Sequence, residues 1–472
     1  MAGATERLSP LDVSFLYLEE PTTPMHVGGV AVFSPPSDAP VDYERIVSII
    51  EERIDLFPRY RQRVRGVPGH LANPVWVDDV DFDVTYHVRR SALPRPGSDA
   101  QLRELVGRLM SRPLDRDRPL WEIYLVEGLA EGRIALITKT HHAMVDGRSA
   151  MDIGALILDT TPEPRQTEHD PWQPGREPGR VQLVAGALRD VVRRPLVAVD
   201  AVRSGVVDAK ALSGRALDAA SGLLSAARIG LRQAPDSPLN ADIGRQRRYG
   251  MCATALEDYK RVRQVHGGTV NDVVLAAVAG GLRAWLLTRG EPVTGRTSLR
   301  AMVPVSVRPS GAAGDGGNKV SSYFVDLPVG EPNPVVRLTQ VSYAMQGVKE
   351  QNQTMGADAI IALSGFAPPT LHALGARLAS SLTRRLFNLV VTNVPGPQFP
   401  LYAAGAPMES VYPVVPLAKG QAVCIGVTSY NGGVFYGLNA DRDAMPDVDV
   451  LAQCIGDAVE ELVATVPGRR HA

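Results

Sequence analysis

The sequence of 472 residues contains little of several features that define particular classes of protein. Its three cysteines, Cys252, Cys424 and Cys454, are too few and too scattered to form a disulfide framework, so we expect a reducing, cytoplasmic setting. Lysine and arginine (50 residues) almost balance aspartate and glutamate (51), and the net charge of −1 argues against a nucleic-acid partner.

Long apolar runs are also scarce. No run of about twenty apolar residues is present to span a bilayer, and the first ten residues lack the apolar stretch of a secretory signal. The longest uncharged segment, residues 420–440, is interrupted by Asn431-Gly432-Gly433. This interruption predicts a hairpin with a type I′ turn between two strands.

The chain is long enough for two domains, and its patterns favour an α/β fold of mixed sheets with flanking helices. Capping signals at Ser98 and Thr269 predict the starts of two helices. Apolar patterns predict strands at 27–33, 121–126, 133–138, 298–307, 320–329, 386–393 and 411–417, and helices at 43–56, 270–287 and 447–466. We predict a first domain over residues 1–165, a linker with bridging helices over 166–244, and a second domain over 245–472.

The segment from Val181 to Gln233 has a character of its own. It is rich in alanine, valine and leucine, is interrupted by Pro195, and carries more basic than acidic residues between Arg180 and Arg232. Two amphipathic helices are predicted here. They could touch a lipid surface, or they could bridge the two domains by packing on both, and the weak, alanine-based apolar faces favour the second interpretation.

The most informative segment is His141-His142-Ala143-Met144-Val145-Asp146-Gly147, which follows the apolar strand 134–137. A neutral histidine can accept a proton near pH 7. Because neighbouring side chains on an extended backbone point to opposite faces, one histidine is expected to face a cleft while the other packs or makes a structural hydrogen bond. Asp146 is expected to fix the loop, and Gly147 to permit a close or left-handed backbone.

Plainer interpretations of these histidines remain open. A single histidine is usually structural, and a pair could bind a metal ion. No further cysteine, histidine or carboxylate stands at ligand spacing, however, so we predict no metal site. From the residues alone, a general-base histidine and a structural histidine are equally good interpretations.

A few polar residues outside this segment are candidates for binding or positioning a substrate. Asn271 and Asp272 fall in the first turn of a predicted helix, where they could cap the helix or face a cleft. Asn393 precedes a rigid turn and could hydrogen-bond a substrate, and Arg308 is the arginine that we would pair with Asp146. Pro119-Leu120-Trp121 has no proton chemistry and is predicted to pack at the domain junction.

The pattern His-His-x-x-x-Asp-Gly is the signature of the chloramphenicol-acetyltransferase-like superfamily of acyltransferases and condensation domains. From Ser9 to the last helix, the chain resembles one branch of it, the bacterial wax ester synthase/diacylglycerol acyltransferase family. The segments that carry this resemblance are, in chain order, Ser9-Pro10-Leu11-Asp12, Pro24-Met25-His26-Val27-Gly28, Pro119-Leu120-Trp121, Thr269-Val270-Asn271-Asp272, Val303-Pro304-Val305-Ser306-Val307-Arg308 and Asn393-Val394-Pro395-Gly396-Pro397.

The resemblance implies two similarly folded domains with the active site at their interface. It implies transfer of a fatty acyl group from acyl-CoA, a co-substrate with no further cofactor, to diacylglycerol or a long-chain alcohol. The superfamily pattern assigns the base to His142 rather than His141. The high arginine, alanine and glycine content fits a GC-rich, actinobacterial source, and the lipid substrates imply peripheral contact with the inner membrane or lipid droplets.

Two alternative functions are compatible with the same residues. A condensation-type member would take its acyl group from a carrier protein, or would acylate a hydroxylated polyketide lipid. A non-catalytic lipid-binding or droplet-coating protein would carry a relic of the site, and the intact His142, Asp146 and Gly147 argue against it.

Overall fold

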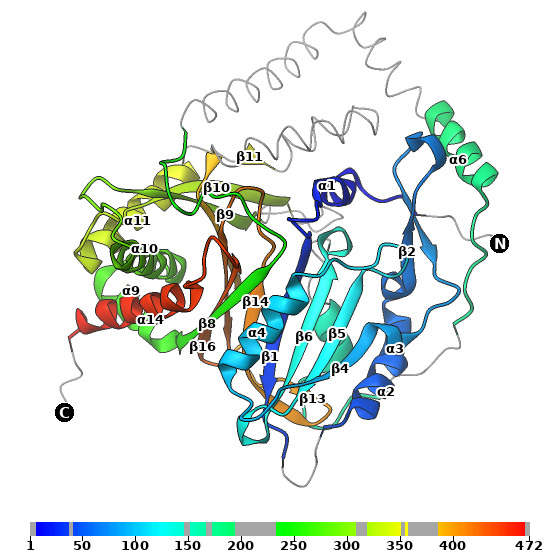
Figure 1. Cartoon of the computed structure of the whole chain (residues 1–472), viewed down its shortest axis with the longest axis horizontal. Coiled ribbons are helices and arrows are strands. Elements are labelled where there is room, and N and C mark those ends of the chain that lie inside the picture. Colours follow the sequence, from blue (N-terminus) through cyan, green and yellow to red (C-terminus); the bar gives the residue numbers. More distant parts are fainter. Residues whose placement is uncertain are drawn as a thin grey trace, which may run out of the picture.

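The computed structural model describes residues 6–36, 41–145, 152–166, 172–193, 233–307, 319–350, 355–356 and 386–467. Two seven-stranded sheets, each with helices packed on it, form the two halves of the molecule (Figure 1). The structure confirms the predicted α/β class of mixed sheets and flanking helices.

The first sheet has the order β4-β5-β6-β1-β14-β13-β7. Its strands are β1 (His26–Phe33), β4 (Val88–Ala92), β5 (Trp121–Glu127), β6 (Ile134–His141), β7 (Leu158–Asp159), β13 (Tyr402–Ala403) and β14 (Ala406–Val414). The helices of this half are α1 (Pro10–Leu18), α2 (Tyr43–Arg53), α3 (Val84–His87), α4 (Asp99–Met110), α5 (Asp152–Ile157) and α6 (Arg180–Arg193). A small separate sheet pairs β2 (Gln62–Arg65) with β3 (Val75–Asp78).

The second sheet has the order β11-β10-β9-β12-β15-β16-β8. Its strands are β8 (Arg247–Ala255), β9 (Leu299–Val307), β10 (Lys319–Leu327), β11 (Met355–Gly356), β12 (Leu389–Pro395), β15 (Val423–Tyr430) and β16 (Gly433–Asp441). The helices α9 (Leu256–His266), α10 (Val270–Thr288), α11 (Pro334–Glu350) and α14 (Val448–Ala464) gather beside this sheet (Figure 1).

The two sheets do not divide at residue 245. β13 and β14 come from the second half of the chain, yet they lie in the first sheet, where β14 pairs antiparallel with β1 in the register Gly28↔Val414. The predicted strand at 411–417 therefore exists, but it begins earlier, at Ala406, and completes the sheet of the other half. The division into 1–165, 166–244 and 245–472 stays a prediction about domains, and the sheets cross it.

Local signals in the sequence explain several of these elements. Ser98 and Gln101 form the predicted capping box of α4. The predicted hairpin links β15 to β16 through Asn431 (φ 43°) and Gly432 (φ 84°), both in the left-handed region that a type I′ turn requires. Gly28 is needed where β1 pairs with β6, because a Cβ atom there would lie 1.9 Å from the carbonyl oxygen of Thr138.

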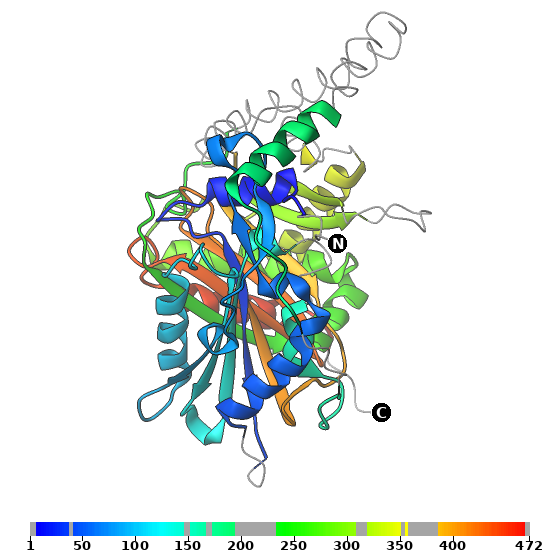
Figure 2. The same ribbon diagram turned by 90° about the vertical axis from the view of Figure 1, so that its right-hand side faces the viewer.

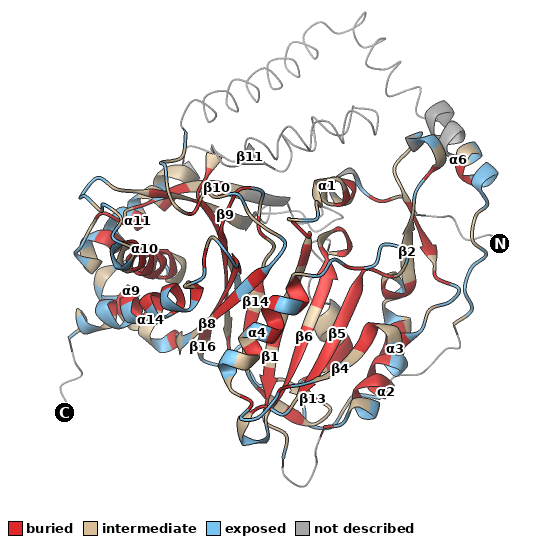
Figure 3. Ribbon diagram, viewed as in Figure 1, coloured by how far each residue is buried: buried red, intermediate tan, exposed pale blue. Residues whose placement is uncertain are grey.

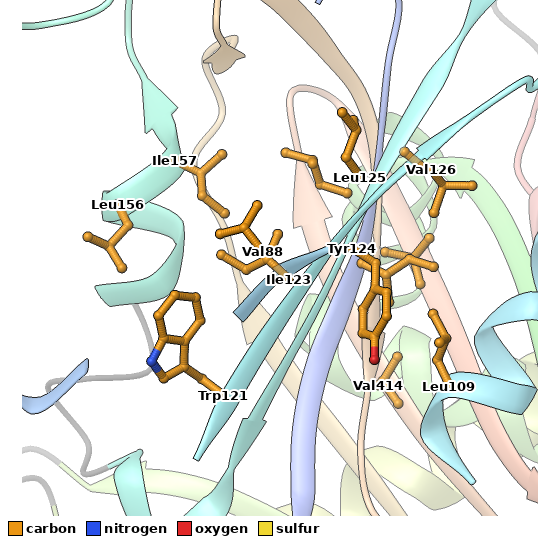
Figure 4. Packing of buried hydrophobic residues seen from close by; sticks show 14 of the residues in the cluster. Val88, Leu109, Trp121, Ile123, Tyr124, Leu125, Val126, Leu156, Ile157 and Val414 are labelled. Carbon is orange, nitrogen blue, oxygen red and sulfur yellow. The ribbon is translucent and has the colours of Figure 1, made fainter. Parts of the chain in front are cut away.

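Strand β5 is buried on both faces, and Figure 4 shows what each face contacts. Trp121 and Ile123 point toward Val88, Leu156 and Ile157, and Tyr124 lies among residues on the other side, as the two-residue period of a strand requires. The Trp121 indole N–H donates to the carbonyl of Tyr60 at 2.7 Å. Trp121 therefore packs in the core of the first sheet and not, as predicted, at the junction of the halves.

Helix α10 is the core helix of the second half, and most of its residues are buried (Figure 3). Among the described residues it is the one helix whose length and composition would allow it to cross a membrane, although Asp272 and Arg283 interrupt its apolar sequence. It is 72% buried within the protein, however, and packs against α14 and α11. Its burial accounts for its apolar sequence.

Of the predicted helices over 181–233, the structure describes only α6, and the rest lie outside the described residues. Leu183 of α6 is buried against Val75 and Val77 of β3, whereas Val181 is exposed. Both α6 and α1 lie at one end of the molecule (Figure 2).

Candidate active site

The histidine motif lies where strand β6 ends. His141 is the last residue of β6, and His142 begins the short turn η5 (His142–Met144), which packs against α1. The His141 N–H donates to the carbonyl of Leu120, and the His142 N–H donates to the carbonyl of Met25 at 2.7 Å. Two motifs of the sequence, Pro119-Leu120-Trp121 and the segment around Met25, therefore support the histidine pair through their backbones.

Asp146 and Gly147, and also Arg308, lie outside the described residues. The expected roles of Asp146 and Gly147, and the pairing of Asp146 with Arg308, stay predictions.

His141 makes structural contacts. Its side chain is buried, and its Nδ1 accepts the N–H of Ala143 at 3.0 Å. Because Nδ1 uses its lone pair in this way, the ring hydrogen sits on Nε2. That Nε2 lies 3.7 Å from Oε1 of Glu19, too far for a hydrogen bond but close enough for electrostatic attraction.

The ring of His142 is half-buried and stacks on Phe15 of α1, with ring centroids 3.9 Å apart and an interplanar angle of 18°. Its Nδ1 is buried and has no hydrogen-bond partner among the described residues. Burial lowers the pKa of His142 to about 4, and the nearby His141 lowers it further, against a backbone hydrogen bond that raises it. The ring is therefore neutral at physiological pH, which is the form that can accept a proton.

Glu19 directly follows helix α1 and lies beside the histidine pair. Its Oε1 accepts the N–H of Met25 at 3.1 Å, and its Oε2 accepts from Nε of Arg116 at 2.9 Å. Burial alone would raise the pKa of Glu19, but the contacts with His141 and Arg116 outweigh it and lower the pKa to about 2. Glu19 is thus an ionised, nearly buried carboxylate beside the motif.

In the second half of the molecule, two of the predicted site residues meet. Asn393 on β12 donates a hydrogen bond from Nδ2 to Oδ1 of Asn271 at 3.1 Å. Asn271 stands in the first turn of α10, and the two residues are 122 positions apart in sequence. This bond fixes the amide plane of Asn271 and leaves its Nδ2 as a donor.

Asp272 caps α10. Its Oδ2 accepts the N–H of Thr269 at 2.8 Å, while its own N–H donates to Oγ1 of Thr269 at 3.2 Å. This reciprocal pair is the capping box, which satisfies two free donors at the helix start. The structure thus provides contacts for the capping interpretation of Asp272, and its carboxylate does not join the Asn271–Asn393 pair.

Phe15, Glu19 and Arg116 were not singled out in the sequence. Glu19 lies between two recognised segments, and the only trace of it there is a carboxylate shortly before Pro24-Met25-His26. Phe15 reads as one more apolar residue of a helix. Among the described residues, no group of three or more histidine, cysteine, aspartate or glutamate side chains could hold a metal ion.

Comparisons with known proteins agree along the whole chain. Residues 8–274 match the model of the wax ester synthase/diacylglycerol acyltransferase catalytic domain, and residues 316–463 match that of the C-terminal domain of the same family. A protein of Mycobacterium tuberculosis named as a probable diacylglycerol O-acyltransferase, tgs1, is 36% identical over 98% of this chain and 97% of its own. Another from that organism, tgs3, is 48% identical over 54% of this chain and 95% of its own.

Among solved structures, the wax ester synthase/diacylglycerol acyltransferase of Marinobacter aquaeolei VT8 is similar with a TM-score of 0.71 and 30% identity, covering 98% of this chain and 99% of that one. The starter condensation domain of rhizomide synthetase is similar in fold, with a TM-score of 0.57 at 15% identity over 98% of this chain and 95% of that one.

Proposed function

Because the chain belongs to the wax ester synthase/diacylglycerol acyltransferase family, we propose that it moves a fatty acyl group from a coenzyme A thioester to the hydroxyl of diacylglycerol or a long-chain alcohol. The observation that carries this proposal is the state of His142. Its ring is neutral, because burial lowers its pKa, and it stacks on Phe15, while its backbone N–H is held by the Met25 carbonyl. A positioned neutral imidazole is suited to general-base catalysis.

In the proposed reaction His142 takes the proton of the acceptor hydroxyl as that oxygen attacks the thioester carbonyl. The carbon–sulfur bond of the tetrahedral intermediate then breaks, and His142 returns the proton to the leaving thiolate. We propose Asn271 as a donor to the oxyanion, because its Nδ2 is left available when Asn393 binds its Oδ1. Both substrates are bound together and no acyl-enzyme forms.

The cysteines support direct transfer. Burial raises the pKa of Cys252 to about 11 and also raises those of Cys424 and Cys454. A thiol in that state is rarely the thiolate that a nucleophile must be.

We further propose that the protein reaches its lipid acceptors by peripheral contact with a membrane or lipid droplet. The burial of α10 supports contact without insertion, since that helix is held in the core of the second half.

The test is release of free thiol from palmitoyl-CoA by the purified protein, with diacylglycerol or hexadecanol as acceptor. We expect acceptor-dependent release, and a fall of about 10²- to 10⁴-fold in kcat for His142→Ala. His266→Ala is the control, because that histidine bonds Thr465 at the far end of α14. Activity retained in folded His142→Ala would remove His142 as the base. No release by the unmodified protein would favour a carrier-protein donor or a non-catalytic lipid-binding role.

A further inference from the structure

We infer that Glu19 is a positioning residue that holds the catalytic histidine in place through His141. This inference rests on the proposed role of His142 as general base. It concerns a carboxylate outside the histidine motif, 122 residues before His141 in the sequence.

One carboxylate oxygen of Glu19, Oε1, is linked by two separate routes to the backbone at and directly after His142. Oε1 accepts the N–H of Met25, and the carbonyl of Met25 in turn accepts the N–H of His142. The same Oε1 faces Nε2 of His141, whose Nδ1 accepts the N–H of Ala143. The backbone N–H groups of His142 and Ala143 are therefore each connected to the Glu19 carboxylate through one intervening residue.

The charge of Glu19 selects the form of His141 that this arrangement needs. An acceptor facing Nε2 favours the ring form with its hydrogen on Nε2, and only that form leaves Nδ1 free to accept from Ala143. Nε2 of His141 is buried and has no other partner among the described residues. At 3.7 Å the contact is electrostatic, and the negative charge of Glu19 favours the form of His141 with its hydrogen on Nε2 by attraction.

The segment that carries Glu19 is itself held from several directions. Arg116 binds the second carboxylate oxygen, Oε2. The next residue, Glu20, pairs with Lys419 at 2.8 Å, and the guanidinium of Arg247 donates to the carbonyl of Thr22. Because Lys419 and Arg247 belong to the second half of the chain, the support beneath His142 is anchored in both halves.

A glutamine at position 19 has the same size but cannot keep these contacts. If its oxygen faces Met25 and His141, its NH₂ group meets the guanidinium of Arg116. If it is turned round, its NH₂ group faces two other donors, the Met25 N–H and the His141 Nε2–H. Either orientation opposes donors at a buried site, so the turn at His142 loses part of its support.

The first experiment measures kcat, KM and melting temperature for Glu19→Gln. Glu127→Gln is the matched control, because Glu127 also pairs with an arginine, Arg90, but lies at the end of β5 away from the histidine pair. We expect Glu19→Gln to lower kcat by about 10- to 100-fold, because a displacement of about 1 Å at a reacting group has effects of that size. KM should change less than about twofold, since positioning of a base acts on the reaction step. Glu127→Gln should keep the unmodified kcat. Equal kcat values for the two variants would overturn the inference.

A double-mutant cycle then asks whether Glu19 acts through His141. In His141→Asn the Oδ1 atom can still accept the Ala143 N–H, but nothing remains to face Glu19. Glu19→Gln should then lower kcat several-fold less in the His141→Asn background than in the unmodified protein, because the contact with His141 is gone and only the contact with Met25 remains. Losses that multiply fully would overturn the inference. If Glu19→Gln fails to fold, Glu19→Asp, which keeps the charge and shortens the reach, should give a smaller loss of kcat by the same route.

Nitrogen-15 NMR of histidine-labelled protein gives a readout that needs no turnover. The His141 signal, identified by its absence in His141→Asn, should report hydrogen on Nε2 in the unmodified protein and a mixture of ring forms in Glu19→Gln. An unchanged ring form overturns the inference. Absence of acyl transfer by the unmodified protein would instead overturn the proposed function, and the NMR result would still decide the role of Glu19.

Discussion

At the scale of single residues, the site depends on how far His142 is kept from water. Burial lowers its pKa to about 4 from an ordinary value of about 6.5, which weakens the base but keeps it unprotonated in mildly acidic conditions. Phe15 covers one face of the ring and so contributes to that burial. The acid limb of the rate profile should therefore lie well below pH 6.

Phe15→Ala should move that limb upward. Opening the ring to water favours the protonated imidazolium and raises the pKa of His142 toward 6.5. More of the base is then protonated at any mildly acidic pH, so kcat/KM should begin to fall at a pH higher by about one unit. The measurement is kcat/KM for thiol release between pH 4 and 8, on protein shown to be folded by its melting temperature.

Phe82→Ala is the matched control, because Phe82 stacks on His87 in the first half with ring centroids 5.3 Å apart. It removes the same kind of contact from a histidine outside the site. A limb that moves equally in both variants, or in neither, would show that Phe15 does not set the pKa of His142.

The sequence revealed the chemistry of this site better than its supports. His141 and His142 could be found because two polar residues at the end of an apolar strand are unusual. Phe15 and Glu19 could not be found in this way, because they come close to the histidines only when α1 packs at the end of β6 in the folded protein. The bond between Asn271 and Asn393 likewise depends on placing the start of α10 beside β12, which neither segment specifies locally.

At the scale of secondary-structure elements, sequence signals predicted the structure well where they depend only on neighbouring residues. The capping box at Ser98 and the two left-handed residues of the 430–433 turn depend on neighbours within four positions, and both were predicted. The capping box of Thr269 and Asp272 is equally local. These two residues can therefore be used to test whether Asp272 has a structural or a functional role.

If Asp272 serves α10 as a cap, Thr269→Ala and Asp272→Ala should behave alike. Each removes one half of the capping box and should lower the free energy of unfolding by about 1 kcal/mol. The specific activity of the folded protein should stay within about twofold of the unmodified value in both, whereas Asn271→Ala should lose far more. Urea denaturation and thiol release measure the two effects. An Asp272→Ala variant that is as stable as Thr269→Ala but far less active would instead place Asp272 among the substrate-positioning residues.

At the scale of the whole molecule, the chain passes from one half to the other at positions that no local sequence pattern indicates. Val411 and its neighbours have the pattern of a strand, but a pattern of alternating burial does not say which sheet the strand will join. β14 joins the first sheet beside β1 while β15, which follows it, returns to the second. That is why the sequence did not reveal that β13 and β14, which follow residue 245, belong to the first sheet.

This crossover predicts that the first half will not fold properly by itself. A fragment of residues 1–244 lacks β14, so β1, with the buried Val30, Val32 and Phe33, becomes an edge strand with open hydrogen-bonding groups. Exposed apolar edges of this kind promote aggregation. We expect the fragment to be aggregated in size-exclusion chromatography, and the same fragment with residues 400–416 attached through a flexible linker to contain a larger monomeric share. A fragment 1–244 that is monomeric, folded and unaffected by the added strand would show that β14 is dispensable to the first sheet.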